Sequence, residues 1–525
     1  MINEGEIISK VFLAIDKAKG NITSFKKSIS DGEYTKIKQP STFSRLLIWK
    51  SILILDTLKI STWESKLNDS RIVFHQLIMR DDMRIPWFEL DEDCQYYQTQ
   101  DIKRKSSINR KSSLRGTKSL KKASFREQVS EDPLNFKKLT KEMEKHSLVN
   151  ENLELLQIII LDIDRLFPGD LFFSESNNSN LLYIKKQLIE ILYVWCKCNI
   201  TIGYKQGFHE ILGLIYKNLY MESINFDLND PKNIKYSNEE LAILSLYNKN
   251  FLCHDLFIIF NKFMLSSGIL SNFYETEIKL TKSIELFNIN LMKIDQFIYY
   301  TLTTKLKLDT QLWIIRYLRL LLSRELGNDM EITNLLWDKL ISSQGSESKE
   351  SSSRIPQLLM FITIILLIQQ KMDLVTSDFS ECLSLLLHYP IIQFKSPSKR
   401  DSYIKNLFKD AEKLYEKRND DLKLYELGNK LNLKYNPSLK ISMNYHKNNN
   451  DLSDTNSNNS ARSSIDSASS VKKQQQQPPQ NQPKNDRHEQ MKFEKTRLEM
   501  KLKKKAQSLM QNGKSIENIN SNDKS

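Results

Sequence analysis

The sequence predicts an all-α fold. Glycine accounts for only 13 of the 525 residues, which disfavours glycine-rich phosphate loops and sheet folds with many tight turns. Apolar residues instead recur at three- and four-residue steps, the spacing of a helix with one buried face. Hydrophobic residues make up 40% of the chain, enough to form a substantial core. We therefore expect a helical body that carries polar appendages.

The first part of the chain predicts peripheral helices followed by the start of the folded body. Residues 1–42 are polar with scattered apolar positions, so we treat them as an N-terminal extension. Folded character begins near Phe43. The apolar series from Arg45 to Leu53 and the later series from Trp63 to Phe74 predict two helices joined by a short turn.

A low-complexity insertion is expected at about residues 92–131, where Ser, Lys and Arg replace the apolar pattern. Beyond it, helices are predicted from Leu153 to Phe167, ending before Pro168, and from Leu181 to Cys198, which contains no Gly or Pro. A further helix is predicted to bury Leu312, Ile315, Leu318 and Leu322 on one face.

The longest largely apolar run extends from Leu358 to Ile368. It is shorter than the ~20 residues that a membrane-spanning helix needs, so it predicts a buried core helix. Residues 396–435 form a C-terminal helical segment by their spacing. Residues 436–525 are rich in Asn, Ser, Gln and Lys and predict a disordered tail, within which Glu489 to Gln507 can form a short charged helix.

The net charge is 77 − 64 = +13, and two segments carry it. Residues 103–126 contain ten Lys/Arg and no acid, and residues 484–505 contain nine Lys/Arg and four acids, so the remainder is 13 − 15 = −2. A nucleic-acid-binding fold would carry its positive charge on a folded face, with aromatic residues for base stacking. Adsorption to an anionic membrane is the use of this charge that we expect instead.

The five cysteines are an odd number at spacings that fit neither a disulfide framework nor a zinc site. The chain starts Met1-Ile2-Asn3-Glu4, without a basic and apolar leader. We therefore expect a protein of a reducing, intracellular compartment.

Several catalytic motifs are absent from the sequence. His209-Glu210 opens an H-E-x-x-H zinc motif, but Gly213 stands at the position of the second ligand. No nucleotide-binding glycine loop or G-x-S-x-G element occurs. The pair Asp162 and Asp164 could hold a divalent metal as a D-x-D motif. Such a motif usually follows a strand, whereas this pair lies in a predicted helix, so we expect no metal site.

Two further motifs carry the functional interpretation. Ile159, Asp162 and Arg165 form I-x-x-D-x-x-R, and Tyr204-Lys205-Gln206-Gly207 forms Y-x-Q-G. Together they resemble the two fingerprints of the TBC domain, the catalytic module of GTPase-activating proteins for Rab/Ypt GTPases. The resemblance covers residues 43–395, interrupted by the insertion, and implies the helical fold of that family.

Other parts of the chain extend the resemblance. They are Arg45-x-x-x-Trp49-Lys50, His254-Asp255, Arg316 to Glu325, Trp337-Asp338 and Leu387-His388-Tyr389-Pro390. The sequences around His209 and of the final motif are most similar to those of the endosomal and Golgi-linked subgroup that includes the retromer-associated TBC protein. Leu166, Phe208 and Tyr317 depart from the family pattern, which puts substrate preference in doubt more than activity.

The resemblance implies a role for each motif residue. Arg165 corresponds to an arginine finger, since an arginine supplied in trans stabilises the charge that develops on the transferring phosphoryl group. Gln206 corresponds to the glutamine that orients the attacking water, and its amide can donate and accept hydrogen bonds together. Asp162 is expected to orient Arg165. Tyr204 and Gly207 are expected to be structural, as are the buried Ile159, Trp49 and Trp337.

The predicted function is stimulation of GTP hydrolysis by a GTP-bound Rab/Ypt GTPase in vesicle and endosomal traffic, without an enzymatic activity of its own. GTP and Mg²⁺ would be carried by the partner, and this chain would need no cofactor. The alternative is a catalytically inactive TBC scaffold that binds a GTPase or a coat complex, and a retromer-like coat is one implied partner. We expect a cytoplasmic protein, peripherally attached to endosomal, Golgi or vacuolar membranes. The insertion also contains serines that follow basic residues, as basophilic kinases require: Ser106, Ser107, Ser112, Ser113 and Ser124.

Overall fold

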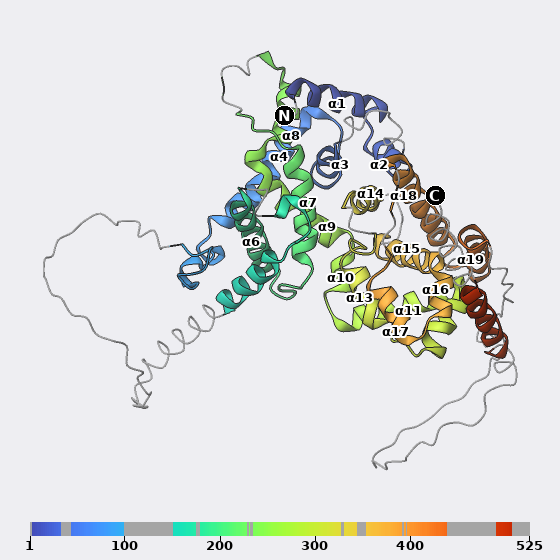
Figure 1. Ribbon diagram of the computed structural model, residues 1–525. Helices are drawn as coiled ribbons and strands as arrows, with labels where there is room; N and C mark the ends of the chain where they lie inside the picture. Colours follow the sequence, from blue (N-terminus) through green and yellow to red (C-terminus); the bar gives the residue numbers. More distant parts are fainter. Residues whose placement is uncertain are drawn as a thin grey trace, which may run out of the picture. The chain divides into compact units, whose positions relative to one another are not determined.

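The computed structural model describes residues 3–32, 44–98, 151–174, 179–227, 230, 235–326, 330–343, 353–390, 393–394, 396–437 and 490–506. Regular structure in these residues is helical, and the β pairing among them is an isolated bridge between Ile224 and Asn248 (Figure 1). The all-α prediction is confirmed. The chain divides into two compact units, Met1–Glu275 with Trp337–Ser353 and Thr276–Leu336 with Arg354–Ser525.

Unit 1 contains the N-terminal half of the chain. Its helices are α1 (Glu4–Lys17), α2 (Ile22–Ser30), α3 (Arg45–Lys50) with a π-helical turn (Ser51–Leu55), α4 (Trp63–Ile78), a helix over residues 151–164, α6 (Leu181–Cys198), α7 (Phe208–Glu222), α8 (Asn238–Tyr247), α9 (Leu252–Ser266), α10 (Ile269–Phe273) and the end of α14 (Met330–Ser342). Short 3₁₀ turns lie at Ile60–Thr62, Asp81–Met83, Trp87–Glu89, Leu171–Phe173 and Lys249–Phe251.

The N-terminal helices belong to the folded body rather than to its periphery. α2 begins after Asn21, whose side chain accepts hydrogen bonds from the backbone amides of Thr23 and Ser24. Val11 of α1 and Phe25 of α2 are fully buried. Lys339 of α14 donates to the carbonyl oxygen of Ile29 at 3.2 Å. Apolar anchors spaced along these polar helices therefore attach them to unit 1, which the expectation of a peripheral extension did not foresee.

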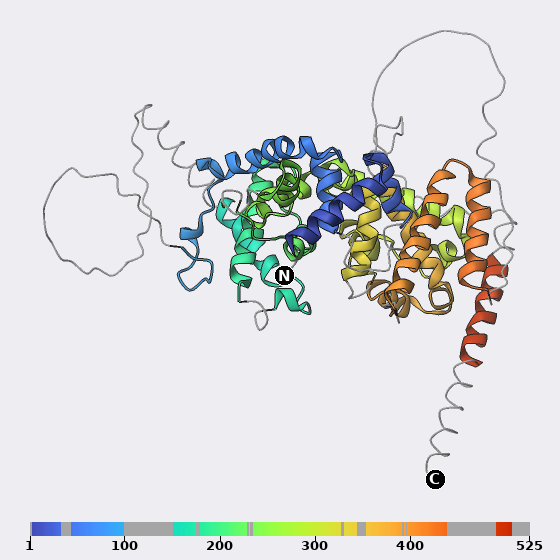
Figure 2. The same cartoon turned by 90° about the horizontal axis from the view of Figure 1, so that it is seen from above.

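Unit 2 contains most of the C-terminal half. Its helices are α11 (Glu277–Ile294), α12 (Gln296–Tyr299) with a π-helical turn (Tyr300–Lys305), α13 (Gln311–Arg319), the start of α14, α15 (Ile355–Gln369), α16 (Lys371–Thr376), α17 (Phe379–Leu387), α18 (Pro397–Glu416), α19 (Asp421–Tyr435) and a helix over residues 490–506. The helix over residues 490–506 is red in Figure 2, and its Arg497 contacts the end of α16 in the same unit.

α15 is the central helix of unit 2. It contains the long apolar run, and its residues from Leu358 to Ile368 are all buried, as predicted. A helix that is apolar on every side is stable only when other helices surround it. No helix in the described residues is long and apolar enough to cross a membrane.

The predicted buried face of α13 is correct at Leu318 and, just beyond the helix, at Leu322, which are both fully buried. It is wrong at Leu312, and Ile315 is only half-buried. Leu312 is 56% exposed, whereas Trp313, Ile314 and Tyr317 are buried with Leu318. The two large aromatic side chains offer more apolar area than the leucine, and the Tyr317 hydroxyl also donates to the carbonyl oxygen of Leu386 at 2.6 Å. The helix therefore turns its aromatic side toward the core.

The remaining expectations divide between described and undescribed residues. The predicted short helix near Glu489 is present as the helix over residues 490–506. Most of the predicted insertion, including the five serines, and the greater part of the tail lie outside the described residues.

Candidate active site

The helix over residues 151–164 presents Arg165 at its C-terminal end. Ile159 and Ile163 point into the core and are fully buried, as Ile159 was expected to be. On the opposite side, Ile158 and Leu161 are 50% and 67% exposed, and the Arg165 side chain is 62% exposed. Because residues at i, i+3 and i+7 share one helical face, these three side chains form an exposed stripe that ends in a guanidinium group.

Asp162 connects the two sequence motifs. It is only 4% exposed, and its Oδ1 atom accepts a hydrogen bond from the Arg165 guanidinium in a short ion pair. Its Oδ2 atom accepts a hydrogen bond of 2.7 Å from the Tyr204 hydroxyl. That hydroxyl also lies 3.0 Å from Nδ1 of His209. One buried carboxylate therefore holds the arginine of the first motif and the tyrosine of the second.

Removal from water sets the protonation state of the Tyr204 hydroxyl. Removal from water, followed by the hydrogen bond to Asp162, raises the pKa of Tyr204 well above its usual range. Tyr204 is therefore a neutral hydrogen-bond donor at any physiological pH. It can position Asp162, but it cannot serve as a base.

Gln206 projects from the turn that precedes α7. Its side chain is exposed. Gly207 follows with φ 107° and ψ −22° as the N-cap of α7. Such a positive φ is readily adopted by glycine, so Gly207 lets the chain turn sharply between the exposed Gln206 and the buried Phe208. The structure thus places Gln206 in solvent, free to meet a partner.

Asp164 makes contacts that are separate from those of Asp162. Its Oδ1 atom accepts hydrogen bonds from Nε2 of Gln95 at 3.2 Å and from the Tyr96 hydroxyl, and Nζ of Lys185 lies 3.2 Å away. Two residues on a helix that are two positions apart do not face each other, which is why the two carboxylates have different partners. No group of three or more potential metal-ligating side chains is found in the described part of the chain.

Gly213, where the zinc motif lacks its second histidine, has a packing role. A Cβ atom at this position would lie 2.7 Å from Cδ2 of Leu166. The glycine therefore allows α7 to lie close to the residue that follows Arg165. Leu166 itself is buried, so the segment carrying Arg165 packs against α7 through this leucine.

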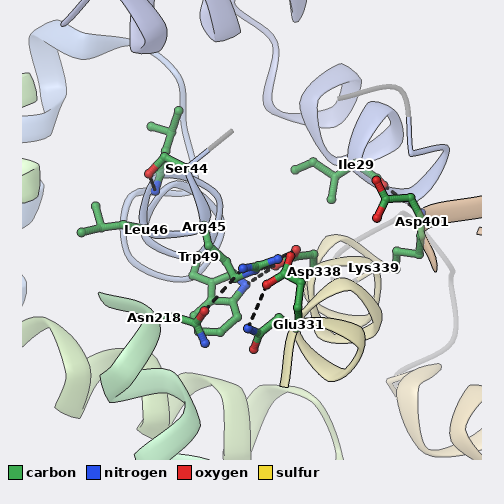
Figure 3. A network of polar contacts seen from close by, with 12 residues as sticks. Ile29, Ser44, Arg45, Leu46, Trp49, Asn218, Glu331, Asp338, Lys339 and Asp401 are labelled. Carbon is green, nitrogen blue, oxygen red and sulfur yellow. Dashed lines mark hydrogen bonds and ion pairs between the residues drawn. The ribbon is translucent and has the colours of Figure 1, made fainter. Parts of the chain in front are cut away.

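A polar network connects α3 to α14 (Figure 3). Asp338 accepts hydrogen bonds from Nε of Arg45 at 3.0 Å and from Nε1 of Trp49 at 2.8 Å, and Nη1 of Arg45 also lies 3.4 Å from Oδ1 of Asn218. Trp49 is fully buried, as is Trp337, which confirms that both are core residues. The motif residues Trp49, Trp337 and Asp338 therefore stabilise the fold and are buried.

A second buried cluster contains one acid and two bases. Asp255 accepts from Nζ of Lys50 at 2.7 Å and from Nε of Arg71 at 2.8 Å, while Lys50 also donates to the carbonyl oxygen of Leu246 at 2.5 Å. Burial alone would raise the pKa of Asp255, but the two cations outweigh burial and lower it. Burial lowers the pKa of Lys50, against the pull of Asp255. Asp255 is therefore charged and ties α3 and α4 to α9.

The sequence pointed to the two exposed side chains, Arg165 and Gln206, and did not predict the residues that pack around the Arg165 segment. Asp162 could be assigned because it belongs to the first motif. The contacts of Asp164 with Gln95 and Tyr96 carry no local sequence signal, since those residues precede it by almost 70 positions. The packing of Leu166 on Gly213 has a weak signal only, a glycine inside an otherwise apolar helix.

A family model described as Rab-GTPase-TBC domain matches residues 111–375, just over half of the chain. The chain belongs to the Rab-GTPase-TBC domain family. The match begins inside the predicted insertion and ends before Tyr389. The wider limits of 43–395 for the TBC domain stay a prediction.

Curated relatives of this TBC protein share part of its length. TBC1 domain family member 5 from Mus musculus is 24% identical over 262 residues, which cover 46% of this chain and 30% of the relative. The Homo sapiens protein of the same name gives the same identity and coverage. TBC1 domain family member 5 homolog B from Dictyostelium discoideum is 33% identical over 115 residues, 22% of this chain and 10% of the relative. The chain thus aligns with less than a third of the length of these relatives.

The solved structure of the Ypt/Rab-GAP domain of Gyp1p is similar to 78% of this chain and 98% of its own, with 15% identity and a TM-score of 0.49.

Proposed function

We propose that this TBC protein is a GTPase-activating protein for a Rab/Ypt small GTPase. The observation that supports this function best is the joint presentation of Arg165 and Gln206. Both side chains are exposed, and they come from two segments that a single buried carboxylate, Asp162, connects through Arg165 and Tyr204.

The two side chains supply what a slow GTPase lacks. Negative charge develops on the phosphoryl oxygens during transfer, and an arginine inserted in trans accelerates hydrolysis by about 10³–10⁵. Arg165 is suited to this role because its guanidinium is permanently charged, exposed and already oriented by Asp162. Gln206 would accept a hydrogen bond from the attacking water and donate one to a γ-phosphate oxygen. GTP and Mg²⁺ would arrive with the GTPase, so the chain needs neither cofactor nor metal of its own.

Ile158 and Leu161 provide an apolar docking surface beside the arginine. Exposed apolar side chains of this size contribute to affinity when a partner covers them. Their position on the face that carries Arg165 would bring the bound nucleotide of the GTPase close to the guanidinium. The GTP-bound state would be recognised because the γ-phosphate is the group that Arg165 contacts.

Single-turnover hydrolysis by a panel of GTP-loaded Rab/Ypt proteins tests this function. We expect stimulation of at least one member by about 10³ or more. The competing function is a catalytically inactive scaffold that binds a GTPase or coat complex. Binding of a GTP-loaded GTPase without stimulation of any member would favour the scaffold.

We further propose that the protein works at endosomal, Golgi or vacuolar membranes in vesicle traffic, where a retromer-like coat would be a partner. The ten cations of residues 103–126 would attract an anionic bilayer at about 1 kcal/mol for each one near its surface. Phosphates on the serines of this segment would add about −1.5 to −2 charges each and weaken that attraction. Flotation with anionic vesicles tests this: equal binding by the wild type and by a deletion of residues 103–126 would exclude it.

A further inference from the structure

The helix over residues 490–506 is docked on unit 2 by an apolar face. Phe493 stacks on the rings of Phe297 and Tyr300, with centroid distances of 5.3 and 5.0 Å. Met500 is 5% exposed and joins a buried cluster with Phe297 and Val375. Two apolar side chains, seven positions apart on one side of the helix, therefore anchor it to α12, the following π-helical turn and α16.

Polar contacts fix the rotation of this helix about its axis. Arg497 donates from Nε to the carbonyl oxygen of Val375 at 3.0 Å and from Nη2 to that of Ser377 at 3.2 Å. These carbonyls lie at the C-terminal end of α16, where a cation is favourable. Lys504 forms an ion pair of 2.6 Å with Asp373, and Glu494 one of 3.1 Å with Lys305. The opposite side of the helix is consequently held toward solvent.

That outward side carries an apolar stripe. Met491, Leu498 and Leu502 are 67%, 55% and 69% exposed. At 3.6 residues per turn these positions lie within about 40° of one another, on the side opposite Phe493 and Met500. An amphipathic helix normally buries one apolar face, whereas this helix has a second one in water.

Lysines border the stripe on both sides. The sequence positions place Lys495, Lys492 and Lys503 along one edge and Lys501 and Lys505 along the other. Each edge also carries one acid, Glu499 on the first and Glu494 on the second. All five lysines are exposed. The helix carries seven Lys/Arg and two Glu, a net charge of 7 − 2 = +5. Of the seven cations, Arg497 and Lys504 are turned toward unit 2, which leaves the five lysines on the outward side and its edges.

We propose that the outward face of residues 490–506 is a lipid-binding site for an anionic membrane surface. An apolar stripe flanked by lysines is the arrangement by which interfacial helices bind, with the apolar side chains in the acyl boundary and the ammonium groups among lipid phosphates. A protein partner would require an acidic counterpart on both edges of so narrow a stripe. A bilayer offers negative charge on both sides of it. Since the opposite face is docked on unit 2, lipid binding would attach that unit to the bilayer directly.

Flotation of the full chain with vesicles tests the site. The vesicles contain phosphatidylcholine alone or with roughly one quarter phosphatidylserine. We expect the wild type to bind the phosphatidylserine vesicles. The double variant Leu498→Gln, Leu502→Gln should bind them at least about tenfold more weakly, because two leucines no longer enter the acyl boundary. The variant Lys492→Gln should lose about fivefold.

The matched control is Leu422→Gln with Leu433→Gln. These leucines are 50% and 63% exposed on α19 of the same unit, so the control makes the same chemical change outside the proposed site. It should bind vesicles like the wild type. Thermal unfolding checks that all variants keep their fold.

Three outcomes would overturn the proposal. They are no binding of the wild type to phosphatidylserine vesicles, equal binding by the Leu498 and Leu502 variant and its control, or a change of oligomeric state in that variant without a change in vesicle binding. The last would show that the stripe contacts a second copy of the chain. None of these measurements involves GTP hydrolysis, so their failure would leave the proposed GTPase-activating function untouched.

Discussion

Replacement of Asp162 by alanine tests how the arginine is positioned. In the structure this carboxylate accepts from Arg165 on one oxygen and from Tyr204 on the other. The substitution leaves both candidate catalytic side chains in place. It removes the group that restrains Arg165, and it deprives the half-buried Tyr204 hydroxyl of its carboxylate acceptor.

The expected magnitudes follow from exposure. The Arg165 side chain is 62% exposed, so its ion pair contributes at most about 1 kcal/mol to stability. The half-buried hydrogen bond from Tyr204 to a charged acceptor contributes about 1.5–3 kcal/mol. Asp162→Ala should therefore lower the free energy of unfolding by about 2–4 kcal/mol. An unrestrained arginine must be ordered in the transition state, which costs up to about 2 kcal/mol, equivalent to a roughly 30-fold slower reaction.

The assay combines urea denaturation with single-turnover GTP hydrolysis by a responsive GTPase. Tyr204→Phe is the comparison, because it removes the hydrogen bond from the Tyr204 hydroxyl and keeps the ion pair between Asp162 and Arg165. It should be destabilised by about 1.5–3 kcal/mol and lose less activity than Asp162→Ala. Wild-type activity in folded Asp162→Ala would refute the positioning role. Complete loss of stimulation in that variant would show that Asp162 does more than orient the arginine.

Three further variants test separate parts of the account. Gln206→Ala should lower stimulated hydrolysis without changing stability, because its side chain is exposed and acts in the transition state. The hydrolysis rate and the urea unfolding curve are measured on the same variant. A loss of rate accompanied by an equal loss of unfolding free energy would contradict this prediction. Leu161→Glu should weaken the apparent affinity for the GTP-loaded GTPase by about 10- to 100-fold with a smaller effect at saturation, and an unchanged KM would exclude the docking surface. Asp255→Asn should cost about 3–5 kcal/mol at neutral pH, because it leaves two buried cations without their acid. The pKa of Asp255 is lowered in the fold, so its carboxylate stabilises the folded state at pH values above its ordinary pKa, and this stability is lost as the pH falls. The free energy of unfolding of Asp255→Asn should therefore depend less on pH in the acid range than that of the wild type.

The sequence predicted those helices whose apolar residues have a clear period. Leu181–Cys198 is helical over the residues that were predicted, because no Gly or Pro interrupts its pattern. The helical segment over residues 396–435 was predicted as a single stretch. It consists of α18 and α19, and the second begins where the Asp420 side chain accepts from the amide of Lys423. Helix periodicity can be read from one segment, whereas a break of a few polar residues is easily missed.

The candidate site was predictable where two short motifs carry it, and its supports were not. Arg165 and Gln206 were proposed as site residues from two motifs alone. Nothing in their local sequence shows that Asp162 would contact both Arg165 and Tyr204. The docking of residues 490–506 was also unforeseen. Phe493 and Met500 are two apolar residues in a charged segment. They can anchor the helix only because Phe297 and Tyr300, almost 200 positions earlier, lie next to it.

The central claim is that Arg165 acts in trans on a bound GTPase. The most direct measurement is single-turnover GTP hydrolysis with Arg165→Ala and Arg165→Lys, alongside binding to the same GTPase loaded with a non-hydrolysable analogue. Stimulation should fall by about 10³ or more in both variants, while binding and the unfolding curve stay close to wild type, since lysine offers a point charge in place of the planar fork. Near-wild-type stimulation by Arg165→Ala with every responsive GTPase would contradict the account.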